Sequence, residues 1–135
     1  MGFTRLPRRR PPTMMRGVGK RILIVDDNPD FRAAAAELLA ERGFELIDEA
    51  ADGDEAFSAV SRACPDGILL DINLPGRDGF AVATSLASAC HRVRIVLTSS
   101  EVDRVAAKVV KNCGATAFVP KDQLATAHLH ELFSG

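Results

Sequence analysis

Acidic, hydroxyl and basic side chains follow four of the apolar runs in this 135-residue chain, close to the point where each run ends. Asp26 and Asp27 follow the first run, Asp71 follows the third, Thr98–Ser100 follows the fourth, and Lys121 follows the fifth. Oxygen ligands from a few carboxylates, with one side left open, suit Mg²⁺, which keeps several waters and accepts a phosphate oxygen. A nearby lysine also offsets the repulsion between crowded carboxylates. The pattern indicates Mg²⁺-dependent phosphate chemistry, provided that the ends of these runs meet.

The apolar runs recur at an even spacing. They begin at residues 22, 44, 68, 93 and 117, so that successive starts lie 22 to 25 residues apart. Each step accommodates a strand, a helix and two short loops, which predicts βα units and a mostly parallel sheet. The sequence itself does not repeat, and this excludes a solenoid.

One-sided apolar patterns between the runs predict helices. The pattern over residues 31–39 has the spacing of one helical face, with Asn28 suited to cap the helix and Pro29 to its first position. Asp52, with Glu55 in capping-box spacing, and Asp78 are the predicted caps of the next two helices.

Two more helices are expected in the C-terminal part of the chain. One spans Val102 to Val110 and ends at Gly114, because glycine readily adopts the conformation that terminates a helix. A shorter amphipathic helix is expected over residues 124–133. Five strands and five helices then account for nearly everything after residue 21.

The composition of the runs favours one strand order. The runs at 22–25, 68–70 and 93–97 are the most apolar, as strands buried on both faces should be. The run at 44–49 contains three acids, and the run at 117–119 is short and followed by proline, so both suit sheet edges. With right-handed crossovers, this gives an α/β fold with a doubly wound, five-stranded parallel sheet of order 2-1-3-4-5. The ligand of such a sheet lies beyond the carboxyl ends of the strands.

Charge and composition exclude several classes of protein. No uncharged apolar run approaches the ~18–20 residues of a membrane span. Residues 1–21 carry seven basic residues and no acid, which leaves the rest of the chain at a net charge of −8. We expect no nucleic-acid binding by so acidic a body, because phosphate neutralisation supplies most of that affinity. Residues 1–20 are expected to form a flexible basic tail; a tail that binds nucleic acid or an acidic partner, and translation starting at Met14 or Met15, remain alternatives.

The three cysteines are odd in number and widely spaced. Cys64, Cys90 and Cys113 lie 26 and 23 residues apart, which matches neither a disulfide framework nor a CxxC metal site. We expect small buried fillers in a reducing cytosol, and a cytoplasmic protein.

Four segments in this order resemble the receiver domain of two-component response regulators, from about residue 20 to 133. They are Ile22–Asp27, Leu69–Gly79, Leu97–Ser99, and Gly114-Ala115 with Phe118–Lys121. The resemblance implies the flavodoxin-like (βα)5 chemotaxis-type fold, whose members are known examples of the 2-1-3-4-5 order. It departs in one place, since members often have proline directly after the lysine, whereas Pro120 precedes Lys121 here and Asp122 follows it. Asp122 is then a candidate cap for the last helix.

The resemblance implies a role for each site residue. Asp71 is the expected phosphoacceptor, and the implied cofactor is Mg²⁺. Its implied ligands are Asp27 directly, Asp26 through water, Asp71, and the backbone carbonyl of Asn73. Lys121 is expected to hold a phosphoryl oxygen.

A switch is implied as well. Thr98 corresponds to the hydroxyl that turns toward the phosphoryl group, and Ser99 to the small residue that leaves Asp71 accessible. Phe118 corresponds to the aromatic that fills the space Thr98 vacates, and plain core packing remains its alternative.

The expected protein is a stand-alone receiver, residues 21–135, and not an enzyme in its own right. Its implied partners are a sensor histidine kinase or phosphotransfer protein and a downstream protein target, bound through the fourth helix, fifth strand and fifth helix; no membrane is involved. Two alternatives are an Mg²⁺-dependent aspartyl-phosphate hydrolase and a phosphorylation-independent interaction module. Asn73 stands where such a hydrolase usually has its second acid, and an intact acidic site argues against the module.

Overall fold

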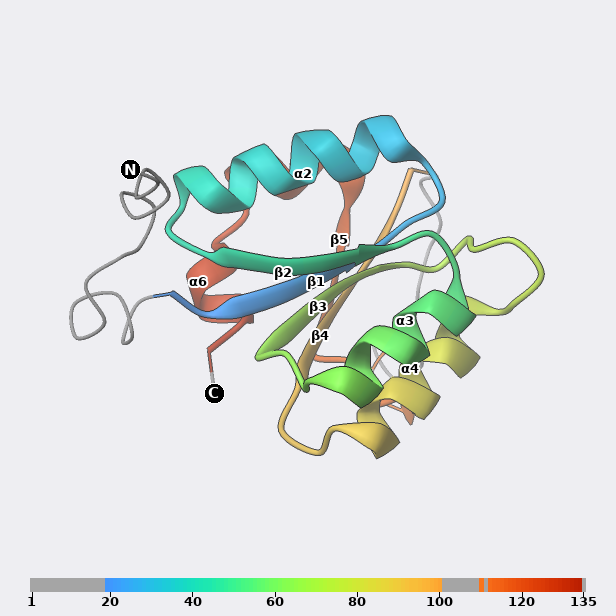
Figure 1. The fold of residues 1–135 in the computed structure, drawn as a ribbon. Helices are drawn as coiled ribbons and strands as arrows, with labels where there is room; N and C mark the ends of the chain where they lie inside the picture. Colours follow the sequence, from blue (N-terminus) through green and yellow to red (C-terminus); the bar gives the residue numbers. More distant parts are fainter. Residues whose placement is uncertain (1–18, 101–109, 111, 135) are drawn as a thin grey trace, which may run out of the picture.

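The computed structural model describes residues 19–100, 110 and 112–134 (Figure 1). Five parallel strands form one sheet in the order β2-β1-β3-β4-β5, which confirms the predicted fold class and strand order. The strands are β1 (Arg21–Val25), β2 (Glu45–Ala50), β3 (Gly67–Asp71), β4 (Arg94–Ser99) and β5 (Ala117–Pro120). The three central strands are the most buried, as their composition predicted.

Helices cover both faces of the sheet (Figure 1). They are α2 (Pro29–Glu41), α3 (Gly53–Arg62), α4 (Gly79–Ala89), the 3-10 helix η2 (Lys121–Thr126) and the short α6 (Leu129–Leu132). The predicted caps are confirmed for α2, α3 and α4: side chains of Asn28, Asp52 and Asp78 each accept backbone N–H groups of the first turn. These caps fix where each helix leaves the carboxyl end of the preceding strand.

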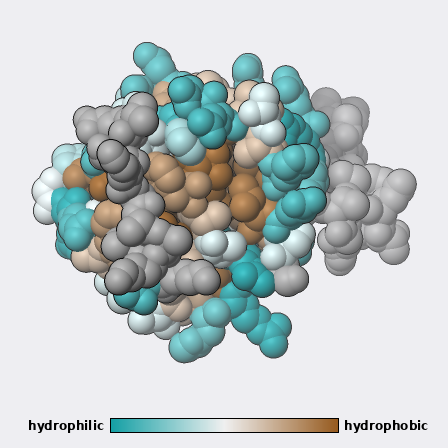
Figure 2. Space-filling model, turned by 180° about the vertical axis from the view of Figure 1, so that it is seen from behind, coloured by the Kyte–Doolittle hydropathy of each residue, from teal (hydrophilic) through white to brown (hydrophobic). Residues whose placement is uncertain are grey.

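Two apolar clusters, one on each face of the sheet, form the core. One packs α3 and α4 against the sheet and includes Val60, Leu70 and Leu86. The other packs α2, η2 and α6 against the opposite face and includes Leu39, Leu124 and Phe133. Seen from behind, the molecule shows apolar atoms near the centre of the view, bordered by hydrophilic residues along the top and right (Figure 2).

The predicted single helix over residues 124–133 is wrong. The chain forms η2, passes through extended Ala127 (φ −75°, ψ 155°), and then forms the short α6. The guanidinium of Arg42 donates to the carbonyl oxygens of Ala125 and Ala127, which a continuous helix would need for its own hydrogen bonds. Asp122 lies inside η2, for which no side chain provides an N-terminal cap, so its predicted capping role is also wrong.

The predicted helix from Val102 to Val110 lies outside the described residues except at its last position. Val110 belongs to the core cluster under α3 and α4. Gly114, expected to end this helix, has φ +88°, in the left-handed region typical of such terminations.

The prediction of three reduced, buried cysteines is wrong for two of them. Cys64 and Cys90 form a disulfide, with their Cα atoms 5.9 Å apart. Cys64 is exposed, and only Cys113 is both free and buried. The two bonded residues follow the C-terminal ends of α3 and α4, which pack side by side. A tertiary contact between helices, rather than a spacing in the sequence, brings the two sulfur atoms together.

Candidate functional site at the carboxyl edge of the sheet

The polar residues that follow the strands meet at one edge of the sheet. β3 and β4 run in parallel register, with Asp71 opposite Thr98 and the Ile72 N–H donating to the Thr98 carbonyl. β1 and β3 are neighbours in the same sheet, which places the residues after Val25 beside those at the end of β3. The site therefore follows directly from the strand order.

Three carboxylates form a cluster at this edge. One oxygen from each of Asp26, Asp27 and Asp71 lies within 4.8 Å of the others. Asp26 is fully buried, Asp71 is 4% exposed, and Asp27 is exposed to solvent. The cluster is therefore open to water on the Asp27 side and closed on the Asp26 side.

Lys121 supplies positive charge to the two buried carboxylates. Its Nζ lies 2.7 Å from Asp26 Oδ2 and 3.7 Å from Asp71 Oδ2. The same ammonium lies 4.2 Å from the centre of the Phe31 ring, in a cation–π contact. The side chain is 16% exposed, so these charges attract each other with little screening by water.

Backbone groups hold Asp26 in place. Its Oδ1 accepts the N–H of Asn28 at 2.9 Å, and its own N–H donates to the Ala50 carbonyl of the neighbouring strand. Its carbonyl accepts from Arg32 Nη1 at 2.6 Å, and Arg32 also pairs with Glu49. The buried Asp26 carboxylate is thus compensated by one hydrogen bond and one ammonium, as a buried charge requires.

Asp71 lies in a less favourable environment. Burial raises the pKa of its carboxyl above 3.8, and the charges of Asp26 and Asp27 raise it further. The N–H of Asn73, 3.0 Å from Asp71 Oδ1, and the Lys121 ammonium oppose this rise in the pKa. Excess negative charge around Asp71 is therefore only partly balanced by the protein.

The loop after Asp71 depends on a glycine. A Cβ on Gly79 would lie 2.3 Å from the Ile72 Cα, so only glycine lets the start of α4 approach the strand end this closely. The Gly79 N–H donates to the Ile72 carbonyl at 3.2 Å, which ties the start of α4 to the residue after Asp71.

The donor set fits a hard divalent cation. All three clustered groups are carboxylates, and one of them faces solvent, which leaves room for bound waters and a phosphate oxygen. A divalent cation would balance the negative charge around Asp71 that Lys121 balances only in part. Mg²⁺ suits these ligands better than zinc, because the cluster contains no histidine or cysteine.

Residues 22–133 match the response regulator receiver domain family. The chain belongs to this family.

Relatives of this receiver domain include longer regulators. It is 36% identical over 105 residues to the transcriptional regulatory protein PdtaR of Mycobacterium tuberculosis, a match that covers 77% of this chain and 50% of that protein. It is 31% identical over 114 residues to the putative positive transcription regulator of virulence factors BvgA of Bordetella pertussis, covering 84% and 53%. The chain spans about half the length of these relatives.

Solved receiver domains share the fold. The signal receiver domain of the putative response regulator NarL from Mycobacterium tuberculosis superposes with a TM-score of 0.72 at 30% identity, over 80% of this chain and 88% of that one. The family is regulatory. Within the described part of the chain, no helix has both the length and the apolar character that crossing a bilayer requires.

Two hydroxyl residues of the receiver domain lie beside Asp71. Thr98 is fully buried, and its Oγ1 has no hydrogen-bond partner among the described residues. Ser99 is also buried, and its Oγ accepts from Asn73 Nδ2 at 2.9 Å. The small Ser99 thus positions the Asn73 side chain, whereas the Thr98 hydroxyl lacks the partner that buried polar groups normally have.

Phe118 lies on β5, and β4 separates it from the strand that ends at Asp71. It pairs with Leu97 in the register of β4 and β5 and packs against the core cluster under α3 and α4. These contacts are those of a core residue, and the switch role of Phe118 stays a prediction.

Sequence patterns missed two residues of the site. Phe31 belongs to the apolar face of α2, and only the folded chain places its ring under Lys121. Arg32 holds the Asp26 carbonyl, a contact that no motif indicates. Both residues lie in the first turn of α2, directly after the capping residue that follows Asp26–Asp27, and that position is the one signal that could have indicated them.

Proposed function

We propose that this receiver domain accepts a phosphoryl group on Asp71 from a phosphohistidine of a partner protein, with Mg²⁺ bound at the carboxylate cluster. The observation that carries the proposal is the arrangement of charge around Asp71: two further carboxylates within 4.8 Å and an ammonium 3.7 Å away. Such a site attracts a divalent cation and a phosphoryl group together, because each offsets charge that the other leaves.

Asp71 is the proposed nucleophile. One carboxylate oxygen forms the new P–O bond while the P–N bond of the phosphohistidine breaks, which yields an acyl phosphate and a free imidazole. A carboxylate suits this task because the acyl phosphate is labile, so the signal can decay. The Asn73 N–H donates to Asp71 Oδ1 and fixes the plane of the carboxylate.

Asp26 and Asp27 are the proposed metal-holding groups, together with Asp71 and the backbone carbonyl of Asn73. Mg²⁺, when bound there, neutralises charge on the transferring phosphoryl oxygens. Lys121 is proposed to hold another phosphoryl oxygen, as a point charge on a long stem. Its ammonium already lies close to the Asp26 and Asp71 carboxylates, so a phosphoryl group on Asp71 would form beside it.

Thr98 is the proposed sensor of phosphorylation. Its buried hydroxyl has no partner among the described residues, and a phosphoryl oxygen on Asp71, its register neighbour, would provide an acceptor. Ser99 keeps the approach to Asp71 free of bulk. Inward motion of Thr98 and Phe118 would then bias the surface near β5 between two states with different affinities for a protein target.

The proposed partners are proteins: a histidine kinase or phosphotransfer protein as donor, and a downstream target. We place the receiver unit at residues 21–135, with residues 1–20 as a basic extension. The proposed unit carries more acids than bases, which disfavours nucleic acid as the ligand of the unit itself. A cytoplasmic location is part of the same proposal.

Intact-mass spectrometry after incubation with acetyl phosphate tests the function. In Mg²⁺, the protein should gain the mass of a single phosphoryl group, and it should gain none in EDTA or as Asp71→Asn. Asp54→Asn is a matched control, because Asp54 is an exposed acid whose carboxylate pairs with Arg77. Uptake by Asp71→Asn equal to that of the parent would overturn the site assignment.

This mass measurement, together with an assay of phosphate release from a phosphate monoester, separates the two alternatives. A hydrolase would turn over a phosphate monoester continuously, whereas a receiver should release phosphate only at the rate at which its own acyl phosphate decays. An interaction module would show no Mg²⁺-dependent mass gain at all. Either result would replace the proposed function.

A further inference from the structure

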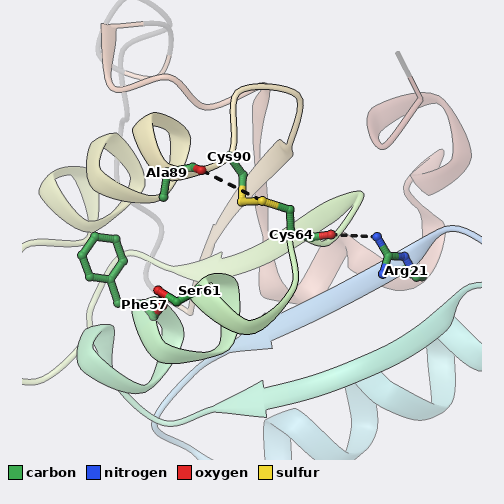
Figure 3. The surroundings of a disulfide bond; sticks show 6 residues. All are labelled: Arg21, Phe57, Ser61, Cys64, Ala89 and Cys90. Atoms are coloured by element: carbon green, nitrogen blue, oxygen red, sulfur yellow. Dashed lines mark hydrogen bonds between the residues drawn. A yellow bond between two sulfur atoms is a disulfide. The ribbon is translucent and has the colours of Figure 1, made fainter.

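The Cys64–Cys90 disulfide lies at the opposite end of the molecule from the carboxylate cluster. Cys64 follows α3 and precedes β3, and Cys90 is the residue at which α4 ends, so the bond joins the C-terminal ends of two neighbouring helices (Figure 3). The bond therefore lies outside the proposed phosphorylation site.

The two sulfur-bearing residues differ in access to water. Cys64 is exposed, whereas Cys90 is 4% exposed and belongs to the core cluster under α3 and α4. A thiolate from solution can reach the Cys64 side of the bond, and Cys90 is then the leaving group. The exposed disulfide has the accessibility expected of a labile bond.

Positive charge gathers beside the bond. The guanidinium of Arg21 donates to the Cys64 carbonyl oxygen at 2.7 Å (Figure 3). One residue beyond Cys90, an open cavity of about 460 Å³ begins at His91 and continues along the loop before β4.

Cations outnumber acids in the lining of this cavity. Lys20, Arg92 and Arg94 contribute to it, with Asp66 as the acid among its lining residues. Asp66 Oδ2 already accepts the Arg21 N–H at 2.7 Å and lies 3.7 Å from Arg21 Nε, so its charge is largely offset. Lys20, Arg92 and Arg94 form no ion pair within the part of the chain that the structure describes. The cavity thus favours an anionic ligand, and its lining residues Asp66 and His91 lie two residues beyond Cys64 and one residue beyond Cys90.

We propose that Cys64–Cys90 is a thiol–disulfide exchange site served by the adjacent basic cavity, and that its substrates are small anionic thiols. A thiolate attacks the Cys64 sulfur, the S–S bond breaks, and Cys90 leaves as a thiolate that takes a proton from water. A second thiolate attacks the sulfur of the first thiol, releasing Cys64 as thiolate and a small disulfide. Two electrons pass from the small thiols to the protein, and the reverse reaction with the small disulfide restores the bond.

Reduction frees the two helix ends. The Cys64 Sγ lies 4.0 Å from the Ala89 carbonyl, which can accept the new thiol hydrogen, so the reduced side chains remain close enough to re-form the bond (Figure 3). The bond joins two residues that are 26 positions apart, and the loop between them contains Asp71 and all of α4. Its redox state therefore sets how firmly α4 is held at the end remote from the carboxylates.

Reduction rates of the native protein test the proposal. We compare the rates at which three thiols reduce the Cys64–Cys90 bond at equal thiolate concentration and low salt: 3-mercaptopropionate, 2-mercaptoethanol and cysteamine. Each rate is divided by the rate at which the same thiol reduces a small neutral disulfide. We expect the anionic thiol to be several-fold faster than the cationic one, with peptide mapping after acid quench placing the first mixed disulfide on Cys64. Arg92→Gln should shrink the preference, whereas Arg77→Gln, an exposed arginine at the other end of the sheet, should retain it.

Three results would overturn the proposal. The first is the absence of the disulfide in protein purified in air. The second is a disulfide that thiols reduce only after the protein is denatured, and the third is a reduction rate that does not depend on the charge of the thiol. None of them bears on phosphorylation, because the readout is the thiol count of unphosphorylated protein.

Discussion

The ammonium of Lys121 lies closer to Asp26 than to Asp71, at 2.7 Å from one carboxylate oxygen and 3.7 Å from the other. In this structure Lys121 is therefore first the counter-ion of a fully buried aspartate and only second a neighbour of the proposed phosphoacceptor. Any group that draws Lys121 toward Asp71 leaves Asp26 in need of another cation. A metal ion at the cluster meets that need.

Replacing Lys121 should destabilise the fold in the absence of metal. Lys121→Met leaves Asp26 buried without its ammonium, and removal of one partner of a buried pair costs about 3 kcal/mol. Urea unfolding in EDTA measures this loss. Lys121→Arg keeps the charge and should lose much less, whereas equal losses in the two variants would show that charge is not the cause.

Asp71→Asn should be more stable than the parent at neutral pH without metal. Burial and the neighbouring carboxylates raise the pKa of Asp71 in the folded protein, so the unfolded chain ionises first as the pH rises above 3.8. The free energy of unfolding of the parent then falls as the pH rises from 3.8 to the pKa of Asp71 in the folded protein. The free energy of unfolding of Asp71→Asn does not fall for this reason. The difference between their unfolding free energies should therefore grow from pH 4 upward, and a difference that stays flat or changes sign would contradict it.

Thr98→Val should stabilise the unphosphorylated protein and weaken its response to phosphorylation. The Thr98 hydroxyl is buried without a partner among the described residues, and an unsatisfied buried hydroxyl costs about 1 kcal/mol or more. Valine has the same shape without the polar group. Thr98→Ser, which keeps the hydroxyl, is the control for the phosphorylation response, read by amide exchange of β5 with and without acetyl phosphate.

The acidic edge of the sheet was predictable because the composition of each strand and the residues at its end can be read directly from the sequence. Asp26, Asp71 and Thr98 each follow a strongly apolar run, and parallel strands bring such ends together. The contact of Lys121 with Phe31 was not predictable, because it joins the start of α2 to the end of β5 across the folded edge.

Two other features depend on tertiary contacts that no local pattern encodes. The break after η2 depends on Arg42, whose guanidinium binds carbonyls more than eighty residues away in the chain. The disulfide depends on α3 and α4 ending side by side. In both cases the decisive partner is distant in the sequence.

Mg²⁺ should stabilise the parent protein. A ligand at a hundred times its dissociation constant adds about 2.7 kcal/mol to the free energy of unfolding when it binds only the folded state. Asp27→Asn should lose most of this stabilisation by Mg²⁺. In EDTA its free energy of unfolding should be close to that of the parent, because Asp27 is exposed. Asp54→Asn is the matched control, and an Mg²⁺ effect of equal size in both variants would place the ion elsewhere.

Reduction of the disulfide should lower the stability of the whole domain. Closing a loop of this length constrains the unfolded chain by an amount equivalent to about 3 kcal/mol. Thermal unfolding of Cys64→Ser and Cys90→Ser should match that of the reduced parent. Unfolding at the same temperature in oxidised and reduced protein would contradict the cross-link.

Chemical trapping of the phosphorylated residue tests the central claim most directly. Borohydride reduces an aspartyl phosphate to homoserine, so the phosphorylated protein, once reduced and digested, reports by peptide mass spectrometry which aspartate carried the phosphoryl group. The account predicts homoserine at position 71 alone, and only when Mg²⁺ was present. Homoserine at position 26 or 27, or unmodified aspartate at 71 in protein that had gained a phosphoryl group, would contradict it.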